Sequence, residues 1–178
     1  MSITTIPALL SASLLCACGG KSPATPVNSV TPVAPGISLE LAQQRKATVS
    51  DLRYRFSLTI PAEPSEAVTG TVEVSFHWRD ADAREVVLDF KDAEHRVHRV
   101  DVNGTPAVVR YEADHLIIPP QVLEADAVNR LLLEITAGDD ALNRNDGFLY
   151  TLFVPDRAHF SLPVFDQPDL KARVTWDL

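Results

Sequence analysis

The sequence predicts a mainly β domain, either an antiparallel β-sandwich or a saddle-like sheet, with a short helix near its N-terminal end. Three observations carry this prediction. Apolar and polar residues alternate strictly over residues 53–60 and again over 71–78, the pattern of strands with one buried face. Further short apolar runs follow, with turn residues between them. The Asn103-Gly104 pair tolerates the positive φ angles of a two-residue hairpin turn.

One helix and two strands are expected at the start of the folded part. Helix-favouring residues occupy 38–47, and Ser38 is a residue type that caps helix N-termini. The strand over residues 53–60 is ended by Pro61 and Pro64, because proline cannot donate to a strand ladder. The second alternating run is then expected to pair antiparallel with the first.

The remaining strands are expected at shorter apolar runs. A segment that folds back after the hairpin turn is included among them. These runs cover residues 86–90, 100–102, 107–111, 116–118, 131–135 and 172–178. A polar loop is expected over residues 137–147. Strands of this number and spacing are typical of a β-sandwich or a related open pair of sheets.

Composition limits the possible partners. The 178 residues are 46% hydrophobic and carry a formal net charge of −8, and no segment has a basic stripe, so no nucleic-acid partner is expected. The chain has two cysteines, Cys16 and Cys18, both within the first 20 residues. A disulfide framework or a thiolate metal site is therefore not expected in the folded part.

The first residues are typical of a targeting segment. The apolar run over residues 6–17 is too short to span a bilayer. The sequence Leu-Cys-Ala-Cys that ends at Cys18 resembles a bacterial lipobox, which implies a lipoprotein-type signal peptide over residues 1–17 and a lipid on Cys18. The protein is then expected to be exported and lipid-anchored to a bacterial membrane, on its periplasmic or cell-surface side. An ordinary signal peptide is the alternative.

A proline-rich segment over residues 18–36 follows, and its composition favours an extended tether. The folded domain is expected over residues 37–178.

Residues that could perform chemistry are few. None of the five histidines occurs in an H-E-x-x-H motif, and no G-x-S-x-G elbow is present. His95 and His98 are expected on one strand, where their side chains point to opposite faces. Asp and Asn residues over 139–146 could hold calcium, but they are also ordinary loop residues. We therefore expect no catalytic residue and no metal ligand in this chain.

The last part of the sequence, over residues 142–146, 148–158 and 162–172, contains a run with Pro163, Phe165, Asp166, Gln167, Pro168, Lys171 and Ala172. This part resembles the end of the N-terminal domain of the aminopeptidase N family of zinc metallopeptidases. The family pattern there is Phe-Pro-Cys-Phe-Asp-Glu/Gln-Pro-x-x-Lys-Ala, and these seven residues match it. Segments around Arg45 to Tyr54, Val86 to Phe90 and Val102 to Gly104 fit the beginning and middle of that domain.

The resemblance covers about residues 40–178 and implies a function for the parent protein. Members of the family remove N-terminal residues from peptides, with zinc held in a second, thermolysin-like domain. This chain would then be a non-catalytic N-terminal domain, incomplete at its C-terminal end and without zinc of its own. Peptide substrate would bind through the catalytic domain of the parent.

Two positions depart from the family pattern. In the family, a glutamine and an acidic residue shortly before the motif help to hold the free amine of the peptide. The corresponding residues here are Leu152 and Val154, and both are apolar. This departure argues against amine recognition by the domain.

The motif also has a purely structural interpretation. Pro168 is expected at the first position of a helix with Asp169 near its positive end, and Leu162 and Phe165 are expected in the core. Two other functions stay open. One is a stand-alone, lipid-anchored β-sandwich module that binds peptide, glycan or a partner protein. The other is an unrelated enzyme with a scattered active site.

Overall fold

The structure is a computed structural model that describes residues 33–79 and 84–178. The expected signal peptide over residues 1–17, the lipid site Cys18 and the expected tether up to residue 32 lie outside the described residues. These features therefore remain predictions. In the described part of the chain, none of the helices has the length and apolar character needed to cross a membrane.

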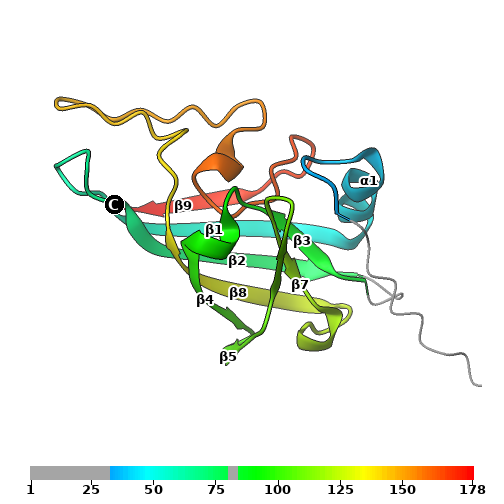
Figure 1. Cartoon of the computed structure of the whole chain (residues 1–178). Helices are drawn as coiled ribbons and strands as arrows, with labels where there is room; N and C mark the ends of the chain where they lie inside the picture. The colour runs from blue at the N-terminus through cyan, green and yellow to red at the C-terminus, as the bar shows by residue number, and fades with distance from the viewer. Residues whose placement is uncertain (1–32, 80–83) are drawn as a thin grey trace, which may run out of the picture.

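A six-stranded sheet forms the larger layer (Figure 1). Its strands lie in the order β5-β4-β8-β2-β1-β9, and every neighbouring pair is antiparallel except β1 and β9, which run parallel. The strands are β1 (Val49–Thr59), β2 (Thr69–Trp78), β4 (Val97–Val102), β5 (Thr105–Pro106), β8 (Ala127–Thr136) and β9 (Arg173–Asp177).

A three-stranded antiparallel sheet, in the order β3-β7-β6, forms the second layer. It consists of β3 (Val86–Asp89), β6 (Arg110–Glu112) and β7 (His115–Ile118). The helices are α1 (Leu39–Thr48), the short α2 (Ala93–Arg96) and two 3-10 turns, η1 (Pro120–Val122) and η2 (Ala158–Phe160). The mainly β fold with a short N-terminal helix is thus confirmed.

The smaller sheet is covered on both faces. Leu88 and Ile118 belong to the main core cluster, which includes the inward residues of the larger sheet. Val87 and Ile117 instead join Leu41 of α1 in a separate cluster. All residues of β3 and β7 are therefore buried, and this explains why, apart from Asp89 and His115, their sequences are apolar at successive positions rather than alternating.

The predicted helix and the two alternating strands are confirmed. The Ser38 hydroxyl accepts a hydrogen bond from the Leu41 amide at 3.1 Å and caps α1. Strand β1 begins four residues before the alternation starts, and its register with β2 shifts between Ser50 and Arg53. Asp51 has a φ of 52° at this irregularity, so the bulge interrupts the alternation that marks the strand in the sequence.

The hairpin turn is confirmed, but the strand expected after it is wrong. Asn103 and Gly104 have φ angles of 52° and 80°. The returning strand β5 has only two residues and ends at Pro106. The expected strand over 107–111 is replaced by β6, which begins at Arg110 and belongs to the other sheet.

Two further expectations are wrong. His95 lies in helix α2 and only His98 lies in a strand, β4. Pro168 and Asp169 form a turn and do not begin a helix. Leu162 and Phe165 are buried in the main core, as predicted.

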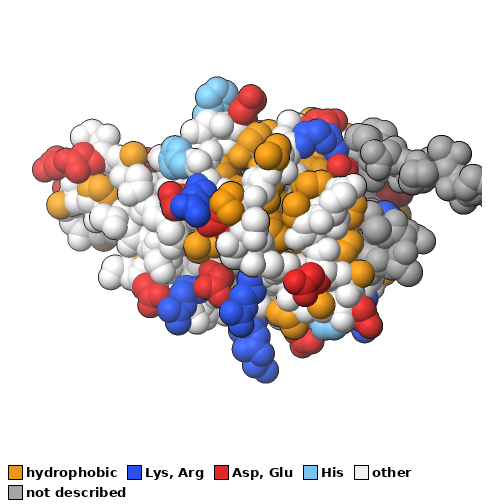
Figure 2. All heavy atoms as spheres, turned by 90° about the horizontal axis from the view of Figure 1, so that it is seen from below, with side chains coloured by type: hydrophobic (Ala, Val, Ile, Leu, Met, Phe, Trp, Pro, Cys, Tyr) orange, Lys and Arg blue, Asp and Glu red, His pale blue; other side chains and the backbone are white. Residues whose placement is uncertain are grey.

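The surface carries charges of both signs. On the face that Figure 2 shows, acidic and basic side chains are interspersed around hydrophobic ones. This face therefore offers no extended surface of a single sign.

Candidate functional site

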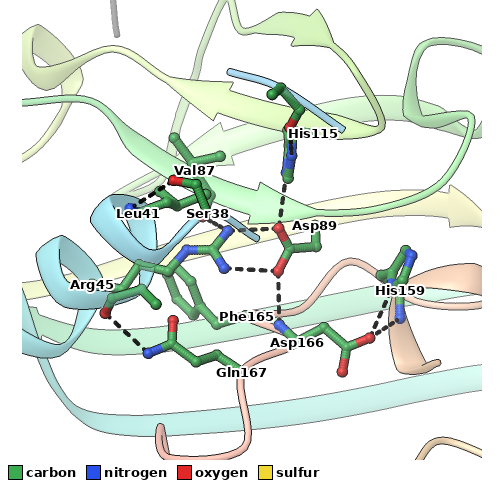
Figure 3. Close-up of polar contacts among 12 residues, drawn as sticks. Ser38, Leu41, Arg45, Val87, Asp89, His115, His159, Phe165, Asp166 and Gln167 are labelled. Carbon is green, nitrogen blue, oxygen red and sulfur yellow. Dashed lines mark hydrogen bonds and ion pairs between the residues drawn. The ribbon is translucent and has the colours of Figure 1, made fainter. Parts of the chain in front are cut away.

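Three segments that are far apart in the sequence meet in one buried polar cluster (Figure 3). Arg45 of α1 donates to both carboxylate oxygens of Asp89 at the end of β3, at 2.9 and 2.6 Å. It also donates to the carbonyl of Val87 at 2.9 Å. The two charged side chains are only 3% and 4% exposed. Arg45 and Asp89 therefore form a buried bidentate ion pair that ties α1 to the smaller sheet.

The motif segment is held by the same aspartate. The amide of Asp166 donates to Asp89 Oδ2 at 2.8 Å. Asp89 and Val164 also exchange two backbone hydrogen bonds, at 2.7 and 3.0 Å. The amide of Phe165 donates to the hydroxyl of Tyr54 at 2.9 Å, which connects the segment to β1. The matched motif thus lies between both sheets.

Two histidines extend the cluster. His115 of β7 has Nδ1 2.8 Å from Asp89 Oδ1 and Nε2 3.1 Å from the carbonyl oxygen of Ala34. His159 of η2 has Nδ1 2.7 Å from Asp166 Oδ2, and its amide donates to the same oxygen at 3.0 Å. Each histidine therefore faces one carboxylate of the cluster.

The surroundings shift the ionisation of these groups. Burial raises the pKa of Asp89, but the hydrogen bond from His115 and the charge and hydrogen bonds of Arg45 outweigh it, so the pKa is lowered overall. The hydrogen bond to Asp166 raises the pKa of His159. Burial raises the pKa of Tyr54, so its hydroxyl stays neutral.

The motif residues that follow Asp166 contact α1 or face the solvent. The side-chain amide of Gln167 donates to the carbonyl of Ala42 in α1 at 3.0 Å and to Asp169 at 2.6 Å. Asp169 also pairs with Lys46 of α1 at 3.0 Å, while Pro168 and Lys171 are exposed. The motif therefore connects α1 to the sheets.

Leu152 and Val154 are exposed to solvent, unlike the residues of this buried cluster. They are 46% and 73% exposed and stand on the long segment between β8 and β9. Phe153 between them is partly buried and stacks on Trp176 of β9, with ring centroids 6.2 Å apart. The same region exposes other large apolar side chains, which together we call the apolar strip: Phe148, Leu149, Tyr150, Leu152, Val154, Val174, Trp176 and Leu178.

The acidic loop that begins at residue 139 uses its first two carboxylates in contacts within the protein. Asp139 accepts two hydrogen bonds from Arg144 at 2.8 Å, and Asp140 pairs with Lys91 at 2.7 Å. Within residues 33–79 and 84–178, no group of three or more His, Cys, Asp or Glu side chains is arranged to hold a metal ion. The carboxylates at the start of this loop are thus used by cations of the protein itself.

The arrangement of the cluster is architectural. Its carboxylates accept hydrogen bonds from groups of the same chain, and its central pair is almost completely buried. Sequence reasoning identified Asp166 and Gln167 but missed the pairing of Arg45 with Asp89. The signal was present, because both residues lie in segments that carry the family resemblance.

This domain is similar to known proteins in its structure. No protein-family model and no curated protein matches this sequence. Among solved structures, native yeast LTA4 hydrolase superposes with a TM-score of 0.60 at 19% identity, over 79% of this chain and 26% of that chain. An M1 zinc metallopeptidase from Deinococcus radiodurans gives a TM-score of 0.58 at 20% identity, over 72% of this chain and 32% of that chain.

A third structure extends the comparison. A mutant of a two-domain M1 zinc metallopeptidase bound to L-arginine gives a TM-score of 0.55 at 23% identity, again over 72% and 32% of the two chains. This chain thus spans about a quarter to a third of the length of those proteins. The shared portion agrees with the N-terminal domain that the motif resemblance implies. The described domain therefore has the fold of one part of the M1 zinc metallopeptidases.

Proposed function

We propose that this chain is the N-terminal, non-catalytic domain of an exported zinc aminopeptidase that removes N-terminal residues from peptides. The observation that carries the proposal is the coincidence of two independent likenesses. The fold matches a part of M1 zinc metallopeptidases that makes up about a quarter to a third of each of those chains. The residues that resemble the family motif are those that join α1 and both sheets around Asp89.

The apolar strip supports a role beside another domain. Phe148, Tyr150 and Val154 are 62%, 52% and 73% exposed, and they stand close together in the sequence. Exposed large apolar side chains that are grouped in one segment are typical of a surface against which another protein packs. A catalytic domain that covers the strip would remove these side chains from water.

Zinc chemistry is assigned to the parent protein and not to this domain. The described residues offer no set of zinc ligands. Zinc bound in a catalytic domain would activate the water that attacks the peptide. In this chain, the side chains of Leu152 and Val154 offer the peptide's amine no hydrogen-bond acceptor, so its recognition by side chains falls to other residues of the parent.

The isolated chain is expected to be inactive. The test is hydrolysis of amino-acid anilides by the purified 178-residue chain, with and without added zinc. We expect no hydrolysis in either condition. Activity that survives chelation and a second purification would show that this chain contains its own active site, and would overturn the proposal.

Export and anchoring are part of the same proposal and rest on the lipobox-like sequence that ends at Cys18. Membrane fractionation of source cells tests them. We expect the protein in the membrane fraction, and its release when Cys18 is replaced by alanine. A Cys18→Ala variant that stays membrane-bound would show that no lipid on this residue is needed.

A further inference from the structure

The outer face of the larger sheet carries a row of basic groups that crosses three strands. The register places Arg53 of β1 beside Ser75 of β2, and Ser75 beside Arg130 of β8. The residues that follow the two arginines, Tyr54 and Leu131, are buried in the core. Because side chains alternate along a strand, the members of the row point away from the core. No single segment of the sequence reveals the row, since each member comes from a different strand.

The two arginines of the row have no anionic partner within residues 33–79 and 84–178. Both are exposed, and neither guanidinium group forms an ion pair or a hydrogen bond in these ranges. Other arginines on the same face differ, because Arg99 pairs with Asp101 at 2.9 Å. The row therefore holds two uncompensated positive charges in a chain whose formal net charge is −8. Guanidinium groups of this kind bind phosphate oxygens well.

The spacing of the row suits one anion between the two guanidinium groups. Neighbouring strands lie about 4.8 Å apart, so about 10 Å separates the Cα atoms of Arg53 and Arg130. Each side chain is long enough to reach a group that lies above Ser75. The hydroxyl of Ser75 is half-buried and forms no hydrogen bond within the described ranges. Two guanidinium groups and one hydroxyl can thus donate together to the oxygens of a phosphate.

A shallow hollow of about 430 Å³ adjoins the row at Arg130, and its lining includes Glu73, Asp101, Asn103 and Leu132. A volume of this size is sufficient for a small organic ligand. The hollow and the row therefore offer a ligand two different environments, one basic and one mixed.

The groups of the hollow that stay available are an acceptor and an apolar surface. Asp101 already accepts hydrogen bonds from Arg99, and the side chain of Asn103 takes part in two hydrogen bonds of its own. The carboxylate of Glu73 forms no ion pair or hydrogen bond in the described part of the chain. Leu132 lies beside Glu73 in the register and is 41% exposed. A carboxylate next to an aliphatic side chain suits a group with both hydroxyls and C–H surface.

We propose that this face binds a phosphorylated sugar, with the phosphate above Ser75 between Arg53 and Arg130 and the sugar in the hollow. Successive outward residues of a strand lie about 7 Å apart, so a hexose held by its phosphate extends from Ser75 toward Glu73. The Glu73 carboxylate accepts from sugar hydroxyls, and Leu132 packs against the C–H face of the ring.

The site lies entirely on β1, β2 and β8, each of which is paired with a strand on both sides. It is therefore independent of the edges of the sheet. The inference goes beyond the proposed function and does not rest on it, because it concerns a face of this domain and not the chemistry of a parent protein.

The test is a titration of the ¹⁵N-labelled 178-residue chain at constant ionic strength, followed by the chemical shifts of its backbone amides. The three probes are glucose 6-phosphate, inorganic phosphate and glucose. We expect saturable binding of glucose 6-phosphate with a dissociation constant on the order of 1 mM, and the largest shifts in β2 and β8. Inorganic phosphate should bind at least about threefold more weakly, and glucose should show no saturation.

Variants separate the two parts of the site. Arg53→Gln and Arg130→Gln should each raise the dissociation constant of both phosphate-bearing probes about fivefold or more, because each removes a charged donor. Glu73→Ala should instead lower the preference for glucose 6-phosphate over inorganic phosphate about threefold. Arg110→Gln is the matched control. It makes the same change on β6 of the smaller sheet and should leave the dissociation constants within about twofold.

Three results would overturn the proposal. The first is the absence of saturable glucose 6-phosphate binding up to about 20 mM, at folded protein that circular dichroism verifies. The second is an affinity that neither Arg53→Gln nor Arg130→Gln lowers, because the ligand would then bind elsewhere. The third is equal affinity for glucose 6-phosphate and for inorganic phosphate or glucose, because the row and the hollow would then not act together.

Discussion

Arg45 and Asp89 are 44 residues apart in the sequence and form a bidentate ion pair that is almost fully withdrawn from solvent. Both members of the pair make further hydrogen bonds to neighbouring segments. Val87 accepts from Arg45, and Asp166 donates to Asp89. The helix, the smaller sheet and the motif segment therefore all meet at one carboxylate, that of Asp89.

Asp89→Asn should be strongly destabilising. The substitution leaves the Arg45 guanidinium buried without a counter-charge, which costs about 3–5 kcal/mol in the free energy of unfolding. Urea denaturation followed by circular dichroism measures the change. Lys46→Ala is the control, because it removes an exposed partner of Asp169 from the same helix and should change stability far less. Similar losses in the two variants would contradict a structural role for the buried pair.

Tyr54→Phe should destabilise the domain without changing its fold. The Tyr54 hydroxyl accepts from the buried Phe165 amide, and removing the acceptor leaves that donor unsatisfied, at about 1–3 kcal/mol. Tyr111→Phe is a matched control on the half-exposed strand β6 and should stay within about 0.5 kcal/mol. Denaturant midpoints compare the two. Equal midpoints for both variants would show that this hydrogen bond contributes nothing.

The alternation of apolar and polar residues predicts some of the strands correctly but not the point at which the chain changes sheets. Strands β1 and β2 were predicted because one face is buried and the other is not, which gives the alternation. The strand predicted over residues 107–111 was wrong, because alternation does not reveal that the chain leaves one sheet at Pro106 and enters the other at Arg110. The turn at Pro168 was predicted as a helix start, since proline is common at both positions.

The polar cluster could be predicted only in part. The motif identified Asp166 and Gln167, and the resemblance quoted the segments that contain Arg45 and Asp89. Which of these side chains meet depends on how α1 packs across the smaller sheet, and no local pattern encodes that packing. His115 was missed for the same reason, because its partners Asp89 and Ala34 are distant in the sequence.

The contribution of His159 to stability should depend on pH. Its pKa is raised in the folded protein by the hydrogen bond to Asp166. The stabilisation is therefore fully present below the unfolded pKa of about 6.5 and is lost as the pH rises through the raised folded value. The melting temperatures of the natural sequence and of Asp166→Asn should differ most near and below pH 6.5, and this difference should shrink as the pH rises through the raised pKa of His159. A difference that grows as the pH rises would contradict the assigned contact.

Gly70→Ala should disturb the contact between β1 and β2. A Cβ at this position would lie 2.1 Å from the carbonyl oxygen of Ser57, and backbone cannot yield as a flexible side chain does. Overpacking of this kind costs about 1–3 kcal/mol. Gly147→Ala is the control, because its Cβ would meet open space. Chemical denaturation measures the free energy of unfolding of both variants. Equal values would contradict the prediction, because they would show that β1 and β2 can move apart at Gly70 at little cost.

The size and activity of the native protein test the central claim most directly. An antibody raised against this domain would detect the protein in membrane fractions of source cells, and the captured material would be assayed for release of N-terminal residues. We predict a species much larger than the 178-residue chain, with aminopeptidase activity that chelation removes and zinc restores. A species of the size of this chain alone, inactive in that assay, would contradict the assignment to a zinc aminopeptidase and would favour a free-standing binding module.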